Sequence, residues 1–147
     1  MTTQNQIGLI DAAYAFVQGT PAQALTSSFA NLVSGTLSAS NNFTYSSDTL
    51  TYTGTYPFPF LFNIYFEGSD TSNNGACVIQ LLHNNTTAYG TANSPGSTTA
   101  QMFSKSVSPA GIITLNNGDT LNLQARAGNN NVTADRYYLV INQITGT

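Results

Sequence analysis

The stretch TYTGTYPFPFLFNIYFE, residues 51–67, decides the fold, because it alternates with a two-residue period and holds the densest aromatic run in the sequence. Alternate side chains of an extended strand point to opposite faces. The other face of this strand holds Leu61 and Tyr65 among polar side chains, so we expect a core strand whose two faces both contact protein. The aromatic face carries Tyr56, Phe58, Phe60, Phe62, Ile64 and Phe66.

The closing stretch YYLVINQI, residues 137–144, is apolar on both faces as well. Burial of both faces predicts a neighbour on the outside of the sheet, which makes a homo-oligomer the favoured interpretation. An arm or loop of the same chain is the alternative cover for that outer face. The interface side chains that we predict are Leu61, Asn63, Tyr65, Tyr138 and Val140.

The rest of the chain has the pattern of a β protein, with short runs of β-formers between clusters of Ser, Asn, Gly and Asp. No strand–helix alternation occurs, so we predict an all-β fold, an antiparallel jelly-roll sandwich of about ten strands. The turns at 69–75 and at Asn116–Asp119 are expected to join consecutive strands, the first of them as a hairpin. The expected strands span residues 28–33, 35–40, 42–45, 49–53, 56–67, 76–83, 100–107, 111–115, 120–127 and 136–144.

Residues 1–27 are expected to form a short N-terminal arm or attachment segment, with the jelly-roll domain at 28–147. Ile7, Ile10, Tyr14 and Val17 recur at helical spacing, yet an extended attachment peptide fits equally well. The segment 20–23 can be read either as a helix-capping box or as a loop that leads into the first strand.

The composition excludes several classes of partner. Only 6% of the residues are charged and the formal net charge is −3. Nucleic-acid binding needs clustered Lys and Arg, so we expect no nucleic-acid partner. No window is long and apolar enough for a membrane span and the first residues do not resemble an export signal, so we expect no membrane insertion. The single Cys77 lies in an apolar run and is expected to be a buried thiol.

Catalysis is hard to build from the residues of this chain. The single histidine, His83, has no titratable partner close in the sequence, and the six acidic residues are scattered. A glycosidase would need a facing pair such as Glu67 with Asp135 or Asp119, and calcium at Asp119 with Asp135 or Asp70 is the metal alternative. We expect neither, and therefore predict a non-enzyme without catalytic residues, cofactor or metal. Asp119 is expected to bond the amides of its own turn.

One sequence pattern resembles a known family. Leu50–Gly54 leads into the aromatic strand, and Leu115, Gly118, Asp119 and Leu121 mark a turn and the strand after it before the apolar closing strand. This order is similar to that of the trimeric jelly-roll superfamily of tumour necrosis factor and the globular head of the complement recognition protein, particularly its small versions in virus and phage spikes. The resemblance covers residues 28–145. It implies strands packed around a threefold axis, hence a homotrimer, with residues 1–27 where a stalk would stand.

The resemblance implies a virion structural protein, a trimeric knob or spike head that is attached to a larger particle by its N-terminal arm. Polar loops on a rigid β scaffold are common recognition sites, so we expect the loops 69–75, 88–99 and 128–135 to present a host-receptor surface. The alternatives are a capsid decoration protein without a receptor role and a secreted or cell-surface lectin, with Tyr56, Tyr65 or Tyr89 as its stacking platform. The predicted receptor or glycan residues are Asp70, Asn73, Tyr89, Asn93 and Asn130.

Overall fold

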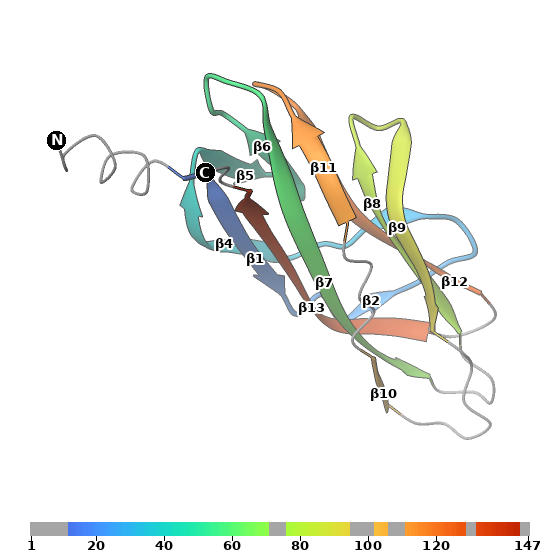
Figure 1. Cartoon of the computed structure of the whole chain (residues 1–147). Helices are drawn as coiled ribbons and strands as arrows, with labels where there is room; N and C mark the ends of the chain where they lie inside the picture. The colour runs from blue at the N-terminus through green and yellow to red at the C-terminus, as the bar shows by residue number, and fades with distance from the viewer. Residues whose placement is uncertain (1–11, 71–75, 95–101, 106–110, 129–131, 145–147) are drawn as a thin grey trace, which may run out of the picture.

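The chain folds into two antiparallel β-sheets packed face to face (Figure 1). The computed structural model describes residues 12–70, 76–94, 102–105, 111–128 and 132–144. None of these residues lies in a helix, and they form thirteen strands. The predicted all-β, antiparallel jelly-roll sandwich is confirmed.

Sheet A has the order β10-β7-β13-β1-β4, with β11 paired to β7 and β2 to β13. Its strands are β1 (Tyr14–Gly19), β2 (Gln23–Ala24), β4 (Gly35–Asn41), β7 (Phe58–Asp70), β10 (Met102–Lys105), β11 (Gly111–Leu115) and β13 (Val132–Gln143). Sheet B has the order β5-β6-β12-β8-β9, with β3 paired to β12. Its strands are β3 (Ala30–Asn31), β5 (Phe43–Ser46), β6 (Thr49–Tyr52), β8 (Cys77–His83), β9 (Thr87–Ser94) and β12 (Thr120–Ala127).

The aromatic strand lies inside sheet A, between β13 on one side and β10 and β11 on the other, as its alternation predicted. Phe60, Phe62, Ile64 and Phe66 are at most 3% exposed and face sheet B. Tyr56 was expected on the same buried face, and this was wrong: it precedes β7 and is 67% exposed. The alternation is valid only where the chain is extended, and the ladder of β7 begins at Phe58.

A cluster of three aromatic rings joins the two sheets near the start of β7. The ring of Phe60 lies 5.1 Å from that of Tyr52 and 5.5 Å from that of Phe43, and both contacts are edge-to-face. Phe43 and Tyr52 belong to β5 and β6 of sheet B and are buried. Such edge-on contacts add to the stabilisation from burial alone, so this cluster fixes the sheets against one another.

The described part of the segment expected to be an N-terminal arm, residues 12–27, belongs to the domain. β1 lies between β13 and β4, and β2 pairs with β13. The expected boundary between residues 27 and 28 therefore moves toward the N-terminus, and residues 1–11 lie outside the described residues. The inward side chains of β1 are Ala15 and Val17, and Ala13 just before the strand is also buried; their small size makes the two-residue period hard to see in the sequence.

The turn at 69–75 does not form the expected hairpin. β7 belongs to sheet A and β8 to sheet B, so the connection passes between the sheets. Turn-forming residues indicate where a chain reverses, but not which sheet receives the next strand. The Asn116–Asp119 turn also passes between sheets, from β11 to β12, and Gly118 adopts the positive φ of 87° that the Asn-Gly pair predicted.

The strand ends define two ends of the sandwich. Tyr14 pairs with Asn142, so the first described strand begins beside the end of the last one (Figure 1). At the other end Asp70 pairs with Val132, and the Gly128 N–H donates to the Ala76 carbonyl at 2.6 Å. We call these the terminal end and the loop end, because the connections 71–75, 95–101 and 129–131 depart from the second.

Two further expectations concern burial and membranes. Cys77 is buried in the core, as its apolar run predicted. Among the residues that the structure describes, no helix has the length and apolar character needed to cross a membrane.

The Gly19→Ala substitution tests the packing of β1 on β13. An added Cβ would lie 2.6 Å from Cε1 of Tyr137, whose buried ring is directly opposite in the ladder. We expect the free energy of unfolding to fall by about 1–3 kcal/mol, measured by urea denaturation. Thr36→Ala on the neighbouring strand changes an exposed side chain and should stay within about 0.5 kcal/mol of wild type. Equal effects of both substitutions would contradict the packing argument.

Candidate functional site

The outer face of sheet A carries a row of aromatic side chains across its three central strands. The ring of Tyr138 on β13 stacks on that of Tyr65 on β7 at 5.4 Å and on that of Phe16 on β1 at 5.8 Å. Tyr138 and Tyr65 are directly opposite in the ladder. The row arises because β7, β13 and β1 each place an aromatic residue on the face that points away from the core.

Aliphatic side chains and another tyrosine extend this row. Leu61 is 38% exposed and pairs with Ile112, which is 62% exposed, while Tyr14 is 42% exposed on β1. Val140 lies beside Asn63 in the β13–β7 ladder. We call this surface the outer patch, and it comprises Tyr14, Phe16, Leu61, Asn63, Tyr65, Ile112, Tyr138 and Val140. A grouped apolar surface of this kind is typical of an interaction site.

The five predicted interface residues all lie within the outer patch. Leu61, Asn63 and Tyr65 are successive outward positions of β7, and Tyr138 and Val140 are the neighbouring outward positions of β13. The sequence analysis missed the contributions of β1 and β11 to this surface. Phe16 and Tyr14 were assigned to the arm, and Ile112 belongs to a strand whose neighbour the sequence does not identify.

The outer face of sheet B is different, because its polar side chains bond to one another. The Gln80 amide donates to Gln124 at 2.9 Å, and the Gln124 amide donates to Asn31 at 2.9 Å. Asn122 is buried and donates to the Thr49 hydroxyl at 2.8 Å. These bonds join β8, β12, β3 and β6, so this face satisfies its own polar groups.

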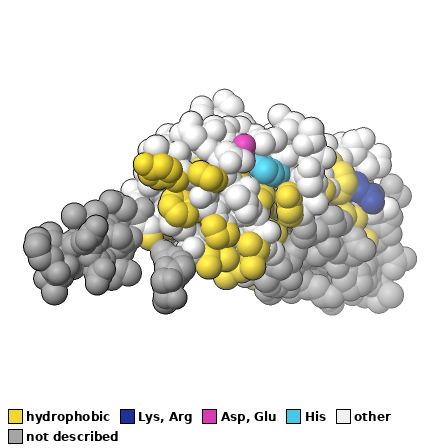
Figure 2. All heavy atoms as spheres, turned by 45° about the horizontal axis from the view of Figure 1, so that its top comes forward, with side chains coloured by type: hydrophobic (Ala, Val, Ile, Leu, Met, Phe, Trp, Pro, Cys, Tyr) yellow, Lys and Arg dark blue, Asp and Glu magenta, His cyan; other side chains and the backbone are white. Residues whose placement is uncertain are grey.

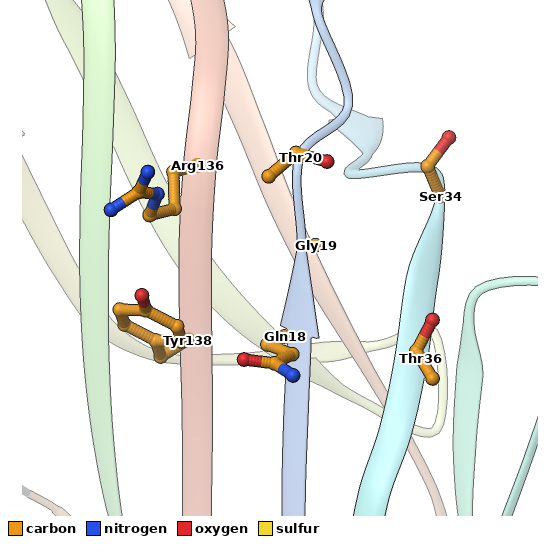
Figure 3. A pocket seen from close by; sticks show the side chains of 7 residues that line it. All are labelled: Gln18, Gly19, Thr20, Ser34, Thr36, Arg136 and Tyr138. Atoms are coloured by element: carbon orange, nitrogen blue, oxygen red, sulfur yellow. The ribbon is translucent and has the colours of Figure 1, made fainter.

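A hollow of about 490 Å³ borders the outer patch (Figure 3). It lies over the middle of β13, the end of β1 and the start of β4, and we call it the β1 hollow. Figure 3 shows its side chains in two rows, with Tyr138, Gln18 and Thr36 in one and Arg136, Thr20 and Ser34 in the other. Gln18 is directly opposite both Tyr138 and Thr36 in the ladders. The lining residues are Gln18, Gly19, Thr20, Ser34, Thr36, Arg136 and Tyr138.

Charge at the β1 hollow comes from one ion pair. The Arg136 Nε lies 3.8 Å from Oε2 of Glu67, and the Tyr65 hydroxyl donates to the other oxygen of that carboxylate. The Arg136 side chain is 50% exposed, so water screens this pair. Glu67 is therefore held from both sides, while the end of the guanidinium remains open to solvent. The backbone of Ser34 has a positive φ of 59°, an uncommon conformation for this residue type.

His83 has a partner that the sequence analysis missed. Its Nε2 lies 2.9 Å from Oδ2 of Asp119, which comes from the β11–β12 turn. The Asn116 N–H and the Asn84 amide also donate to this carboxylate, each at 2.9 Å. The bond from the Asn116 N–H confirms the turn role predicted for Asp119. Figure 2 shows the histidine beside an acidic side chain on a surface with few charges.

Burial raises the pKa of Asp119, but the hydrogen bonds from Asn116, Asn84 and His83 outweigh it, so the net pKa lies below the usual value. The carboxylate therefore stays ionised and connects the β8–β9 turn to the β11–β12 turn. Asn84 adds to this connection by accepting from the Thr120 N–H at 2.8 Å. The geometry is that of a structural clamp, because the Asp119 carboxylate bonds only to His83, Asn84 and Asn116 among the described residues, all in or beside these two turns.

The acidic pairs considered for hydrolysis or calcium do not come together. Asp119 lies near the terminal end, because Leu115 pairs with the first residue of β7, whereas Asp135 lies at the bulge of β13 near the loop end. Glu67 faces outward from sheet A beside Arg136. Among the described residues there is no group of three or more His, Cys, Asp or Glu side chains that could hold a metal ion.

The predicted receptor residues are divided between different parts of the molecule. Asp70 ends β7 at the loop end, and Asn93 pairs there with Val78. Tyr89 packs partly against the core, 6.0 Å from the His83 ring, near the terminal end. Asn73 and Asn130 lie outside the described residues. Of the proposed stacking tyrosines, Tyr65 already stacks on Tyr138.

Comparison with known proteins gives similarity in structure only. No family model matches the sequence, and no curated protein matches it. The Eiger tumour necrosis factor of S. frugiperda aligns with a TM-score of 0.63 at 9% identity, over 93% of this chain and 95% of that one. The globular domain of zebrafish complement 1qA aligns at 0.58 and 10% identity, over 92% and 98%.

The fold of this chain is also similar to that of a vertex protein. Vertex protein P5 of PRD1 aligns with a TM-score of 0.58 at 12% identity, over 90% of this chain and 97% of that one. At such low identity the likeness shows the fold alone. The resemblance to the jelly-roll superfamily of tumour necrosis factor and the complement head is thereby confirmed at the level of the fold.

The acid sensitivity of the protein tests the clamp. A carboxyl whose pKa is lowered by folding contributes stability above its unfolded pKa of about 3.9, and this stability is lost as the pH falls below that value. We expect Asp119→Asn to lower the free energy of unfolding at pH 7 by about 1–3 kcal/mol and to flatten its decline between about pH 5 and pH 2. Urea denaturation across this pH range measures both. An unchanged stability and an unchanged pH slope would disprove the clamp.

Proposed function

We propose that this jelly-roll chain is the trimeric head of a non-enzymatic virion structural protein. In this proposal the head is a knob or spike attached to a larger particle, and it presents loops to a host receptor. The outer patch carries the proposal, since it leaves an aromatic surface uncovered on a fold shared with a vertex protein and with tumour necrosis factor and complement heads. These neighbours support a jelly-roll head; its place in a virion is our inference.

The outer patch is the proposed trimer interface. It is aromatic and aliphatic, with Asn63 as a polar member, whereas the opposite face of the sandwich bonds its own amides. Aromatic residues are enriched in protein interfaces and charged residues are depleted from their centres. Glu67 and Arg136 lie next to the patch and pair with each other, which suits a polar rim. Three copies around an axis would each bury one such patch.

We infer a direction of attachment from the two ends of the sandwich. β1 begins and β13 finishes at the terminal end, which suits attachment through residues 1–11. β7 has thirteen residues, so the loop end lies about 40 Å away along the strand. The connections at the loop end would then point away from the particle, where a receptor could reach them.

A capsid decoration protein without a receptor role is the nearest alternative. It would share the fold, the interface and the attachment. Binding of the fluorescent, purified head to host cells separates the two functions, because a decoration protein gives no saturable binding. A secreted or cell-surface location remains the alternative to the virion, and detection of the chain in purified particles by mass spectrometry decides between them.

The interface proposal is tested by a charge placed in the outer patch. We expect wild type to show a concentration-independent trimer mass by light scattering, and Val140→Asp to shift it to a monomer, because an unpaired carboxylate would be buried in the interface. Thr44→Asp is the matched control, since it places the same charge on an exposed outward position of sheet B. A wild-type monomer, or a Val140→Asp trimer at low concentration, would exclude this interface.

The polarity of attachment is tested on the particle. We expect an antibody to bind a peptide tag inserted between residues 72 and 73, which separate β7 from β8, on intact particles. A tag before residue 1 should become accessible only after the particles are disrupted. The reverse pattern of accessibility would overturn the proposed orientation.

A further inference from the structure

We propose that the β1 hollow binds a monosaccharide that carries a carboxylate group. This proposal adds a ligand class to the host-binding role proposed above and rests on that role for its biological meaning. The binding itself needs one protomer only, because all the lining side chains come from β13, β1, β4 and the residues next to them.

The guanidinium of Arg136 supplies the charge for recognition. Its Nε faces Glu67, and among the described residues no hydrogen bond uses its two terminal nitrogens. Figure 3 shows this guanidinium and the Tyr138 hydroxyl group on the same side of β13, with the hydroxyl directed toward the arginine. A planar guanidinium edge bonds the two oxygens of a carboxylate in parallel, and such charge-assisted pairs are the strong ones.

The other lining side chains suit the hydroxyl groups of a sugar. Gln18, Thr20, Ser34 and Thr36 are exposed, and in the described part of the chain their side chains make no hydrogen bond. On sheet B, by contrast, the amides bond one another. Hydroxyl and amide groups both donate and accept, as sugar hydroxyls do. The hollow therefore offers several exposed polar groups that have no hydrogen-bond partner within the described part of the chain, with one cation at its edge (Figure 3).

The spacing of these groups fits a ring of monosaccharide size. Tyr138, Gln18 and Thr36 are in register on three adjacent strands, which separates the outer two by about 10 Å. Arg136 is two residues before Tyr138 on β13, which separates the two rows of the hollow by about 7 Å. Gly19, between the rows, contributes only its backbone to the hollow, because a side chain there would point inward to the buried Tyr137 ring.

The same observations disfavour other ligand classes. Six of the seven lining residues have polar side chains, so an apolar ligand would leave them without partners. A phosphate would bring close to two negative charges near Glu67, which already neutralises part of the Arg136 charge. The ring faces of Tyr138 are covered by Tyr65 and Phe16, so recognition here uses hydrogen bonds and charge, not stacking of the sugar on an aromatic ring.

Titration of the full chain with two acidic sugars tests the proposal. The probes are N-acetylneuraminic acid and glucuronic acid, each compared with its methyl ester, and binding is measured by saturation-transfer NMR. We expect at least one acid to bind with a Kd of about 1 mM, as suits a small shallow site, and its ester to bind about tenfold more weakly because the charge is lost. No saturable binding of either acid up to about 20 mM, or equal binding of acid and ester, would overturn the assignment.

Two variants locate the binding. Arg136→Gln should weaken binding of the acid about tenfold, while Arg126→Gln should leave it unchanged, because Arg126 lies over the Phe29 ring near sheet B. Thr36→Val keeps the side-chain shape and should weaken binding several-fold by removing one hydroxyl. Equal losses in Arg136→Gln and Arg126→Gln would refute the site. Circular dichroism confirms folding of each variant.

Light scattering on the same samples separates this inference from the proposed head. A monomer that binds the acidic sugar refutes the trimer and keeps the ligand site. A trimer that binds no acidic sugar keeps the head and refutes the site.

Discussion

The pairing of β7 with β13 is the constraint on which the rest of the structure depends. The two strands are hydrogen-bonded from Phe60 to Asp70, and their register decides which side chains face the core and which face outward. A slip of β13 by one residue along β7 would turn Ile141 outward and bring Val140 inward, while Phe62 stayed in the core. The buried aromatic face and the exposed outer patch are therefore two results of one register. Stabilising the core necessarily presents Tyr65 and Tyr138 side by side on the surface.

The sequence predicted this central pair well, because both strands have strong two-residue periods and both are long. It predicted β1 poorly. The inward positions of that strand are Ala15, Val17 and Gly19, and the last of them has no room for a side chain because the buried Tyr137 ring lies against it. A large side chain on one strand thus leaves room only for a small residue opposite it, and small residues do not show a hydrophobic alternation in the sequence. A pattern in one segment cannot reveal that its partner already fills the space.

The candidate site was predictable only in part for a related reason. The five expected interface residues lie on two strands with clear periods, and they are adjacent in the structure. The β1 hollow combines Arg136 with Gln18 and Thr36, which are 118 and 100 positions before it in the sequence and meet it only through the order β13-β1-β4. The contact of His83 with Asp119 was missed for the same reason. The two residues are 36 positions apart in the sequence, and only the pairing of His83 with Leu121 brings them together. Both the β1 hollow and the His83–Asp119 contact depend on the order of strands in the sheets, which the turn residues do not predict.

The near absence of charge on this chain makes these placements informative. With three basic residues in total, a guanidinium beside a row of hydroxyl groups cannot be explained as one member of a general basic surface. Arg126 lies over the Phe29 ring, whereas the Nε of Arg136 forms an ion pair with Glu67. The two described arginines therefore have different surroundings, on opposite sheets. Because uncharged amides and hydroxyls cover most of the surface, the Arg136 charge and the grouped aromatic rings are the two features from which we propose contacts with other molecules. Both features adjoin at Tyr138, on the outer face of sheet A.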